Sequence, residues 1–147
     1  MKKLNLPEFP AKVKQVDGKV MIFDIIRKKY IQLTPEEWVR QNFIYYLVNF
    51  LDYPKSLIKV ESGLRYNRLL KRSDILVFNR DVEPLLLVEC KSSDLKITQD
   101  VVDQAAVYNR SLNARYLLVT NGIQHLCWQI SDDGNRLLED IPRYDDL

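Results

Sequence analysis

The sequence predicts an α/β fold in which helices flank a mixed β-sheet, and three observations support this prediction. Apolar residues recur at helical spacing in two stretches, which begin at Thr34 and Thr98. Between these stretches, residues 74–78 and 85–91 form two apolar runs of strand length. A third apolar run, residues 115–120, follows the second helix, which is long enough for a right-handed crossover between parallel strands.

The composition is that of a globular protein without a membrane span. A chain of 147 residues has the size of one domain, and we expect a single domain with its core at about residues 27–130. No segment has the roughly 20 consecutive apolar residues that a bilayer span requires. Pro7 and Pro10 interrupt the apolar stretch that a signal peptide needs, and the two cysteines have no metal-type spacing, so we expect a cytoplasmic protein.

The first expected elements are a hairpin and a helix. Residues 11–24 contain a turn at Asp17-Gly18 between two short strands. Thr34 and Glu37 have the spacing of a capping box, and Pro35 suits the first helical position, so a helix should run from there to about Asp52. The buried stripe of this helix should consist of Val39, Phe43, Leu47 and Phe50.

The middle of the chain predicts three strands. Ile58 and Val60 alternate with polar residues as in a half-buried strand, and residues 64–67 could resume or pair with it. The two apolar runs at 74–78 and 85–91 should then form a hairpin with a longer loop.

The last part predicts a helix and two strands. Strands at 115–120 and 124–130 are separated by a turn at Asn121-Gly122. After the N-terminal hairpin, the expected order is therefore helix, three strands, helix, two strands. One face of the second helix should be formed by Val101, Ala105, Tyr108 and Leu112.

Two charged residues stand out in an otherwise apolar strand. Glu89 and Lys91 are two residues apart, so their side chains should leave the same face of the sheet. A hairpin symmetric about Asp81 and Val82 places Asp74 opposite Glu89. Like charges at directly opposed positions repel each other, and a divalent cation would remove that penalty.

This arrangement predicts a magnesium site. Mg²⁺ prefers a few carboxylates with several retained waters, which Asp74 and Glu89 would supply together with the backbone carbonyl of Cys90. Such a metal, Mg²⁺ or Mn²⁺, can activate water and neutralise charge on a phosphate, while Lys91 orients the water or stabilises the transition state.

An aspartate followed by Glu-x-Lys on the next strand resembles the core of the PD-(D/E)XK phosphodiesterases. It is written here Ser73-Asp74, fourteen residues, then Glu89-Cys90-Lys91. From about Arg27 to Gly122 the chain resembles the N-terminal nuclease domain of the restriction subunit (HsdR) of type I restriction enzymes. The resemblance implies a restriction-endonuclease-like core and a Mg²⁺-dependent DNA endonuclease.

Two further features strengthen the resemblance. Gln104 and Tyr108 match the Gln-x-x-x-Tyr signature that follows the Glu-x-Lys strand in this family, and as i and i+4 residues they are neighbours on one helix face. The family also has a glutamate in its first helix that can hold a metal-bound water. Glu36 or Glu37 matches it, and Glu36 is preferred because the helix cap already explains Glu37.

Two departures from the family pattern bear on function. Ser73 replaces the proline that gives the motif its name, which matters little because that proline is not a ligand. The sequence has no Gly-x-x-x-x-Gly-Lys-Ser/Thr loop, so ATP-driven translocation cannot come from this chain and would need a separate motor or specificity subunit.

The single histidine, His125, rules out a histidine-based nuclease or a zinc site of the usual composition.

The expected partner is DNA, and alternatives to a restriction-type nuclease remain open. Basic residues that precede Asp74 could contact DNA phosphates or form a solvated edge strand; they are Arg65, Arg68, Lys71 and Arg72. The same fold could serve as a catalytically silent module that binds DNA or docks a partner. It could also serve as a junction-resolving enzyme, which would need a homodimer to present two sites.

Overall fold

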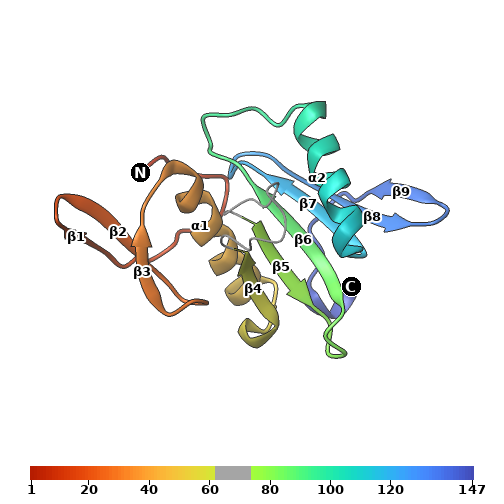
Figure 1. Cartoon of the computed structure of the whole chain (residues 1–147), viewed down its shortest axis with the longest axis horizontal. Coiled ribbons are helices and arrows are strands. Elements are labelled where there is room, and N and C mark those ends of the chain that lie inside the picture. The colour runs from red at the N-terminus through yellow and green to blue at the C-terminus, as the bar shows by residue number, and fades with distance from the viewer. Residues whose placement is uncertain (62–73) are drawn as a thin grey trace.

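The computed structural model describes residues 1–61 and 74–147, and Figure 1 shows their arrangement. Within these residues a three-stranded sheet lies at one end of the molecule, with α1 (Pro35–Phe50) between it and a six-stranded sheet. The second helix is α2 (Gln99–Leu112). The expected α/β fold with a mixed sheet is confirmed.

The six-stranded sheet has the order β4-β5-β6-β7-β8-β9, so the strands are neighbours in their sequence order. Strands β6 and β7 run parallel and are joined through α2, as the crossover prediction requires, whereas the other neighbouring pairs are antiparallel. The strands are β4 (Ile58–Glu61), β5 (Asp74–Phe78), β6 (Pro84–Cys90), β7 (Tyr116–Thr120), β8 (His125–Ser131) and β9 (Gly134–Leu137).

The β5–β6 hairpin has the predicted register over most of its length. Ile75 pairs with Val88, Leu76 with Leu87 and Val77 with Leu86, as a hairpin symmetric about Asp81 and Val82 requires. The register shifts by one residue next to the loop, where Phe78 pairs with Pro84. Here the side chain of Asn79 accepts hydrogen bonds from the backbone nitrogens of Asp81 and Glu83, which closes the loop.

Helix α1 begins as the sequence predicts. Thr34 is the N-cap, and its hydroxyl accepts a hydrogen bond from the backbone nitrogen of Glu37. Val39, Phe43 and Leu47 are buried, but the prediction that Phe50 completes the stripe is wrong, since this residue is 45% exposed. The buried face instead continues through Ile44. The reason is that Phe50 is the last helical residue, and the chain turns there toward Leu51 and Tyr53, which fill that part of the core.

The two helices cover opposite faces of the large sheet and define two cores. The first core packs α1 against residues such as Ile75, Val88 and Cys90. The second packs Ala105 and Tyr108 of α2 against the other face. The cap of α2 at Thr98 and its predicted apolar face are confirmed, with Val101 and Leu112 partly buried at the edge of the second core.

The three-stranded antiparallel sheet contains more than the predicted hairpin. Strands β1 (Val13–Val16) and β2 (Lys19–Asp24) enclose the expected turn, but β3 (Lys29–Gln32) pairs with the other side of β2 and was not predicted. Strand β9 was also missed. Both are four-residue strands next to charged or polar turns, too short to show an alternating pattern. Among the described residues, neither helix has the length and apolar character that a bilayer span requires.

Candidate active site

Glu89 is a carboxylate buried at the end of a core strand. Only 2% of this residue is exposed, and Leu85–Cys90 are all buried. Strand alternation puts Glu89 on the same face as Leu87, which belongs to the second core, and its neighbour across the parallel ladder is Val119 of that core. The carboxylate therefore lies on the side of the sheet that α2 covers.

Lys91 follows directly and lies at the border of the sheet. Its backbone nitrogen donates a hydrogen bond of 2.8 Å to the carbonyl of Thr120, which extends the β6–β7 ladder by one residue. The alternation of side chains therefore continues to this residue, and Lys91 and Glu89 leave the same face of the sheet. Lys91 is partly exposed, so a fixed backbone carries a cation at the point where the sheet meets solvent.

The partner acid Asp74 is placed by its backbone. It is the first residue of β5 and pairs with Glu61 of β4. Extending the β5–β6 register by one residue beyond Ile75 and Val88 brings the backbone of Asp74 opposite Glu89, as predicted. The side chain of Asp74 lies outside the described part of the structure, as do Ser73 and the four basic residues predicted to contact DNA, Arg65, Arg68, Lys71 and Arg72.

The signature residues of α2 lie over the same face as Glu89 and differ in exposure. Tyr108 is 7% exposed and packs in the second core with Leu87 and Val119. Gln104 lies one turn earlier on the helix and is exposed. Tyr108 is therefore part of the second core, whereas Gln104 is accessible from solvent.

Glu36 comes from the opposite layer, at the start of α1. It and Cys90 both lie close enough to Arg40 to influence its pKa, so the first turns of α1 lie near the carboxyl end of β6. The side chain of Cys90 faces the first core and is fully buried. Glu36 is therefore carried by a helix that packs on the face of the sheet opposite to that of Glu89.

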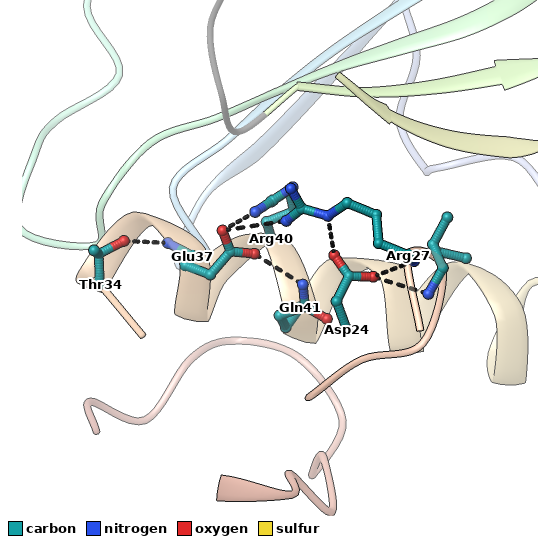
Figure 2. Close-up of polar contacts among 7 residues, drawn as sticks. Asp24, Arg27, Thr34, Glu37, Arg40 and Gln41 are labelled. Atoms are coloured by element: carbon teal, nitrogen blue, oxygen red, sulfur yellow. Dashed lines mark hydrogen bonds and ion pairs between the residues drawn. The ribbon is translucent and has the colours of Figure 1, made fainter. Parts of the chain in front are cut away.

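Next to Glu36, a buried network of charged groups joins α1 to the three-stranded sheet (Figure 2). Glu37 forms an ion pair with Arg40, accepts a hydrogen bond of 2.8 Å from Gln41, and lies 3.8 Å from the guanidinium of Arg27. Arg27 in turn donates to Asp24 at 2.7 Å. Glu37 is therefore held within this network by partners from α1 and from the turn that follows β2.

Burial and neighbouring charge act together on Arg40. Arg40 is 1% exposed, and burial, reinforced by the positive charge of Arg27, lowers its pKa to about 10. The group therefore keeps its charge near neutral pH. A buried cation that retains its charge needs an anion, and Glu37 supplies it.

Sequence reasoning missed this network. One signal was present, because Glu37, Arg40 and Gln41 have i, i+3 and i+4 spacing and therefore share one face of α1. The contribution of Asp24 and Arg27 could not be read in the same way, since it depends on how a separate sheet packs against the helix.

The loop after Lys91 is fixed by contacts with distant parts of the chain. The side chain of Asn121, in the turn between β7 and β8, donates a hydrogen bond of 2.8 Å to the carbonyl of Leu95. Lys2 lies 3.7 Å from Asp94, and Trp38 of α1 donates to the carbonyl of Lys2. The N-terminal segment therefore contacts both α1 and the loop after Lys91, and restrains the sheet edge at which Lys91 lies.

The donor set suits a hard divalent cation better than a metal that needs many protein ligands. Among the side chains that the structure describes, which do not include those of Glu61 and Asp74, no three of His, Cys, Asp or Glu come together as a metal site. Mg²⁺ needs only one or two carboxylates, with waters and phosphate oxygens completing its shell. Glu89 fits that requirement, because it is an oxygen ligand held at a sheet end by a rigid strand.

Comparison with known proteins identifies a family for most of the chain. Residues 35–142 match the family described as "Type I restriction enzyme R protein N terminus (HSDR_N)". The match begins with α1 and includes Glu36, Glu89, Lys91, Gln104 and Tyr108. No curated protein and no solved structure matches the chain. Because the match covers well over half of its residues, the chain belongs to the family of type I restriction enzyme R protein N termini.

Proposed function

We propose that this chain is a Mg²⁺-dependent DNA endonuclease domain of the type I restriction enzyme R N-terminal kind. The observation that supports it most directly is the buried carboxylate of Glu89, two residues before Lys91, at the end of a parallel strand pair in the family-matched region. Glu89 and Lys91 put a carboxylate and an ammonium group at one border of the sheet, a combination that suits metal-assisted cleavage of a phosphodiester.

In the proposed site, Asp74, Glu89 and the carbonyl of Cys90 would hold Mg²⁺ or Mn²⁺. The ion would lower the pKa of a bound water and neutralise charge on the phosphate. The backbone of Lys91 is held at the sheet border, so its ammonium group would reach the phosphate or the attacking water from a fixed position.

The remaining residues have supporting roles in this proposal. Glu36 would accept a hydrogen bond from a water at the metal, reaching it from α1. Gln104 is exposed on the face of α2 and would orient Lys91 or the phosphate. Tyr108 is mostly buried, so its part would be to hold the wall of the site in place.

The test is cleavage of supercoiled plasmid and of single-stranded DNA in Mg²⁺ or Mn²⁺, compared with EDTA. We expect Lys91→Ala to lower the rate at least a hundred-fold, the order of magnitude lost when one transition-state group is removed. The matched control is Lys55→Ala, which removes an exposed lysine near the opposite end of the β4–β5 pair and should leave the rate unchanged. Equal rates for Lys91→Ala and the unmodified chain would refute this mechanism.

A second measurement separates the nuclease from a silent module on the same fold. A metal that binds only the folded chain raises the melting temperature by mass action. We expect Mg²⁺ or Mn²⁺ to raise it in the unmodified chain but not in Glu89→Gln, with Glu83→Gln, an exposed glutamate in the β5–β6 loop, as the control. Salt-dependent DNA binding with neither cleavage nor a metal effect would indicate the silent module instead.

A further inference from the structure

The three-stranded sheet has an outer face of unusual composition. Cross-strand pairs of Lys14 with Met21, Val16 with Lys19 and Phe23 with Tyr30 place these side chains on one face. Lys12 joins them because its carbonyl accepts the backbone hydrogen bond of Phe23. We define the outer face as Lys12, Lys14, Val16, Lys19, Met21, Phe23, Tyr30 and Gln32.

The opposite face of this sheet is the one that packs against the rest of the chain. Ile22 and Asp24, which alternate with the outer-face residues of β2, are both completely buried. Asp24 is part of the network that reaches α1 (Figure 2). The outer face is therefore directed away from α1 and is available to a partner.

The outer face carries positively charged side chains and no negatively charged ones. Lys12, Lys14 and Lys19 are all exposed, and the eight residues of the face include no aspartate or glutamate. Lys14 lies on β1, an edge strand, and Lys12 directly precedes that strand, so ammonium groups follow the edge of the sheet. A flat, uncompensated row of this kind complements a phosphate backbone.

Two aromatic rings lie among these lysines. The rings of Phe23 and Tyr30 are 5.2 Å apart in an edge-to-face arrangement, and both residues are partly exposed. The ammonium group of Lys14 is 4.0 Å from the centre of the Tyr30 ring, and that of Lys12 is 5.8 Å from the centre of Phe23. Lysines that only kept an edge strand soluble would not need exposed aromatic rings beneath them.

We propose that the outer face binds single-stranded DNA, with the three lysines on phosphates and a base on the Phe23–Tyr30 pair. Sheet surfaces that combine cations with aromatic rings bind single strands because unpaired bases offer free π-faces, which a duplex does not. The surface lies before residue 35, outside the region that the family match covers, so it is an addition to the candidate active site. The choice of DNA rather than RNA rests on the proposed function.

The test is binding of a fluorescently labelled oligothymidylate of about 16 nucleotides, measured by anisotropy in EDTA on the Glu89→Gln background. Without metal or an intact site there is no cleavage, so the result is independent of the nuclease proposal. We expect Lys12→Gln/Lys14→Gln/Lys19→Gln to weaken binding at least ten-fold. The slope of log K against log salt should fall by about 2, at about 0.7 for each phosphate contact.

The matched control removes the same charge elsewhere. Lys55→Gln/Arg110→Gln/Arg115→Gln also neutralises three exposed cations, which lie outside the three-stranded sheet. Equal weakening by the two triple variants would overturn the proposal, because binding would then follow net charge alone.

A double variant tests the aromatic pair. Phe23→Leu/Tyr30→Leu should weaken single-strand binding about ten-fold and leave the weaker binding of a duplex of the same length unchanged. If the double variant binds the oligothymidylate normally, or if the duplex binds as tightly as the single strand, the single-strand assignment is wrong. Circular dichroism of each variant checks that the sheet has folded, and the lysine variant, altered only at exposed positions, provides the test independently of the aromatic one.

Discussion

The buried network of Figure 2 predicts that Asp24 is a major contributor to stability. This residue is completely buried, and one carboxylate oxygen accepts hydrogen bonds of 2.8 Å from the backbone nitrogen of Ile26 and 3.0 Å from that of Arg27. Its other oxygen accepts from the side chain of Arg27 at 2.7 Å. Substitution by alanine would leave these three donors without their acceptor.

The expected cost follows from these contacts. Each buried donor that loses its partner costs about 1–3 kcal/mol, and breaking a buried ion pair from one side costs about 3–5 kcal/mol. The donors here are only partly buried, so we expect Asp24→Ala to lower the free energy of unfolding by about 4 kcal/mol. Asp24→Asn keeps an oxygen for the two backbone donors but loses the charge and the acceptor of the Arg27 side chain, so its cost should be about 2 kcal/mol.

The measurement is urea unfolding followed by circular dichroism at pH 7. Asp17→Asn is the matched control, because Asp17 is exposed and its φ of 52° is a conformation that asparagine also adopts. Its cost should stay within about 0.5 kcal/mol. If Asp24→Asn proves as stable as Asp17→Asn, the energetic reasoning about the network is wrong.

The pH dependence of the free energy of unfolding is a second test of the contribution of Asp24. Burial raises the pKa of Asp24, but the hydrogen bonds from Arg27 and Ile26 and the charge of Arg27 outweigh burial and lower it overall. A carboxyl whose pKa is lower in the folded chain stabilises it above the unfolded pKa, and that stabilisation is lost as the pH falls through the folded pKa. The difference between the unmodified chain and Asp24→Asn should therefore be full at pH 7 and shrink in acid.

Two further predictions concern the turn between β7 and β8. A Cβ on Gly122, whose φ is +85°, would lie 2.7 Å from a methyl carbon of Leu4, so Gly122→Ala should cost about 2 kcal/mol or more in urea unfolding and loosen the N-terminal segment. His125 donates from Nε2 to the carbonyl of Asn5 and accepts at Nδ1 from the hydroxyl of Thr120, and its burial lowers its pKa. Its neutral form is thus favoured in the fold, so stability should fall as the pH drops from 7 through the folded pKa; a His125→Gln variant that shows the same fall would contradict this.

Elements with a strong local signal could be predicted from the sequence. Helices α1 and α2 have capping residues at Thr34 and Thr98 and an apolar period, and both begin where those caps predict. The β5–β6 register followed from the symmetry of two apolar runs, and three pairs from Ile75 to Val77 confirm it. Local sequence determines these features, so contacts between distant segments did not alter them.

The features that were missed depend on contacts between distant segments. Strand β3 acquires its role only by pairing with β2, and Phe50 leaves the core because the chain turns after it. The same holds for the buried network, in which Arg27 bridges an acid of the small sheet and an acid of α1. Charged residues normally indicate surface, so burial of such a set has no signature in a single sequence.

The candidate site shows the same division. The shared face of Glu89 and Lys91 and the burial of Tyr108 followed from strand and helix periods, and the structure places Glu89 and Tyr108 on the face of the sheet that α2 covers. The exposure of these side chains could not be predicted from their i, i+4 spacing, since Gln104 and Tyr108 are neighbours on the helix yet only Tyr108 is buried. Gln104 lies beside the stripe of Val101, Ala105 and Tyr108 that faces the second core, so its side chain reaches solvent.

The network and the candidate site are connected through α1. The role proposed for Glu36 requires that the helix be held at one rotation and one height against the end of β6, and apolar packing through Val39 and Phe43 alone would tolerate small shifts. Glu37 lies next to Glu36 and is held by Arg40 on its own helix and by Arg27 from the small sheet. Directional, charge-assisted contacts of this kind lose energy steeply with displacement. The small sheet therefore does more than extend the chain's surface, because it fixes the helix that carries Glu36.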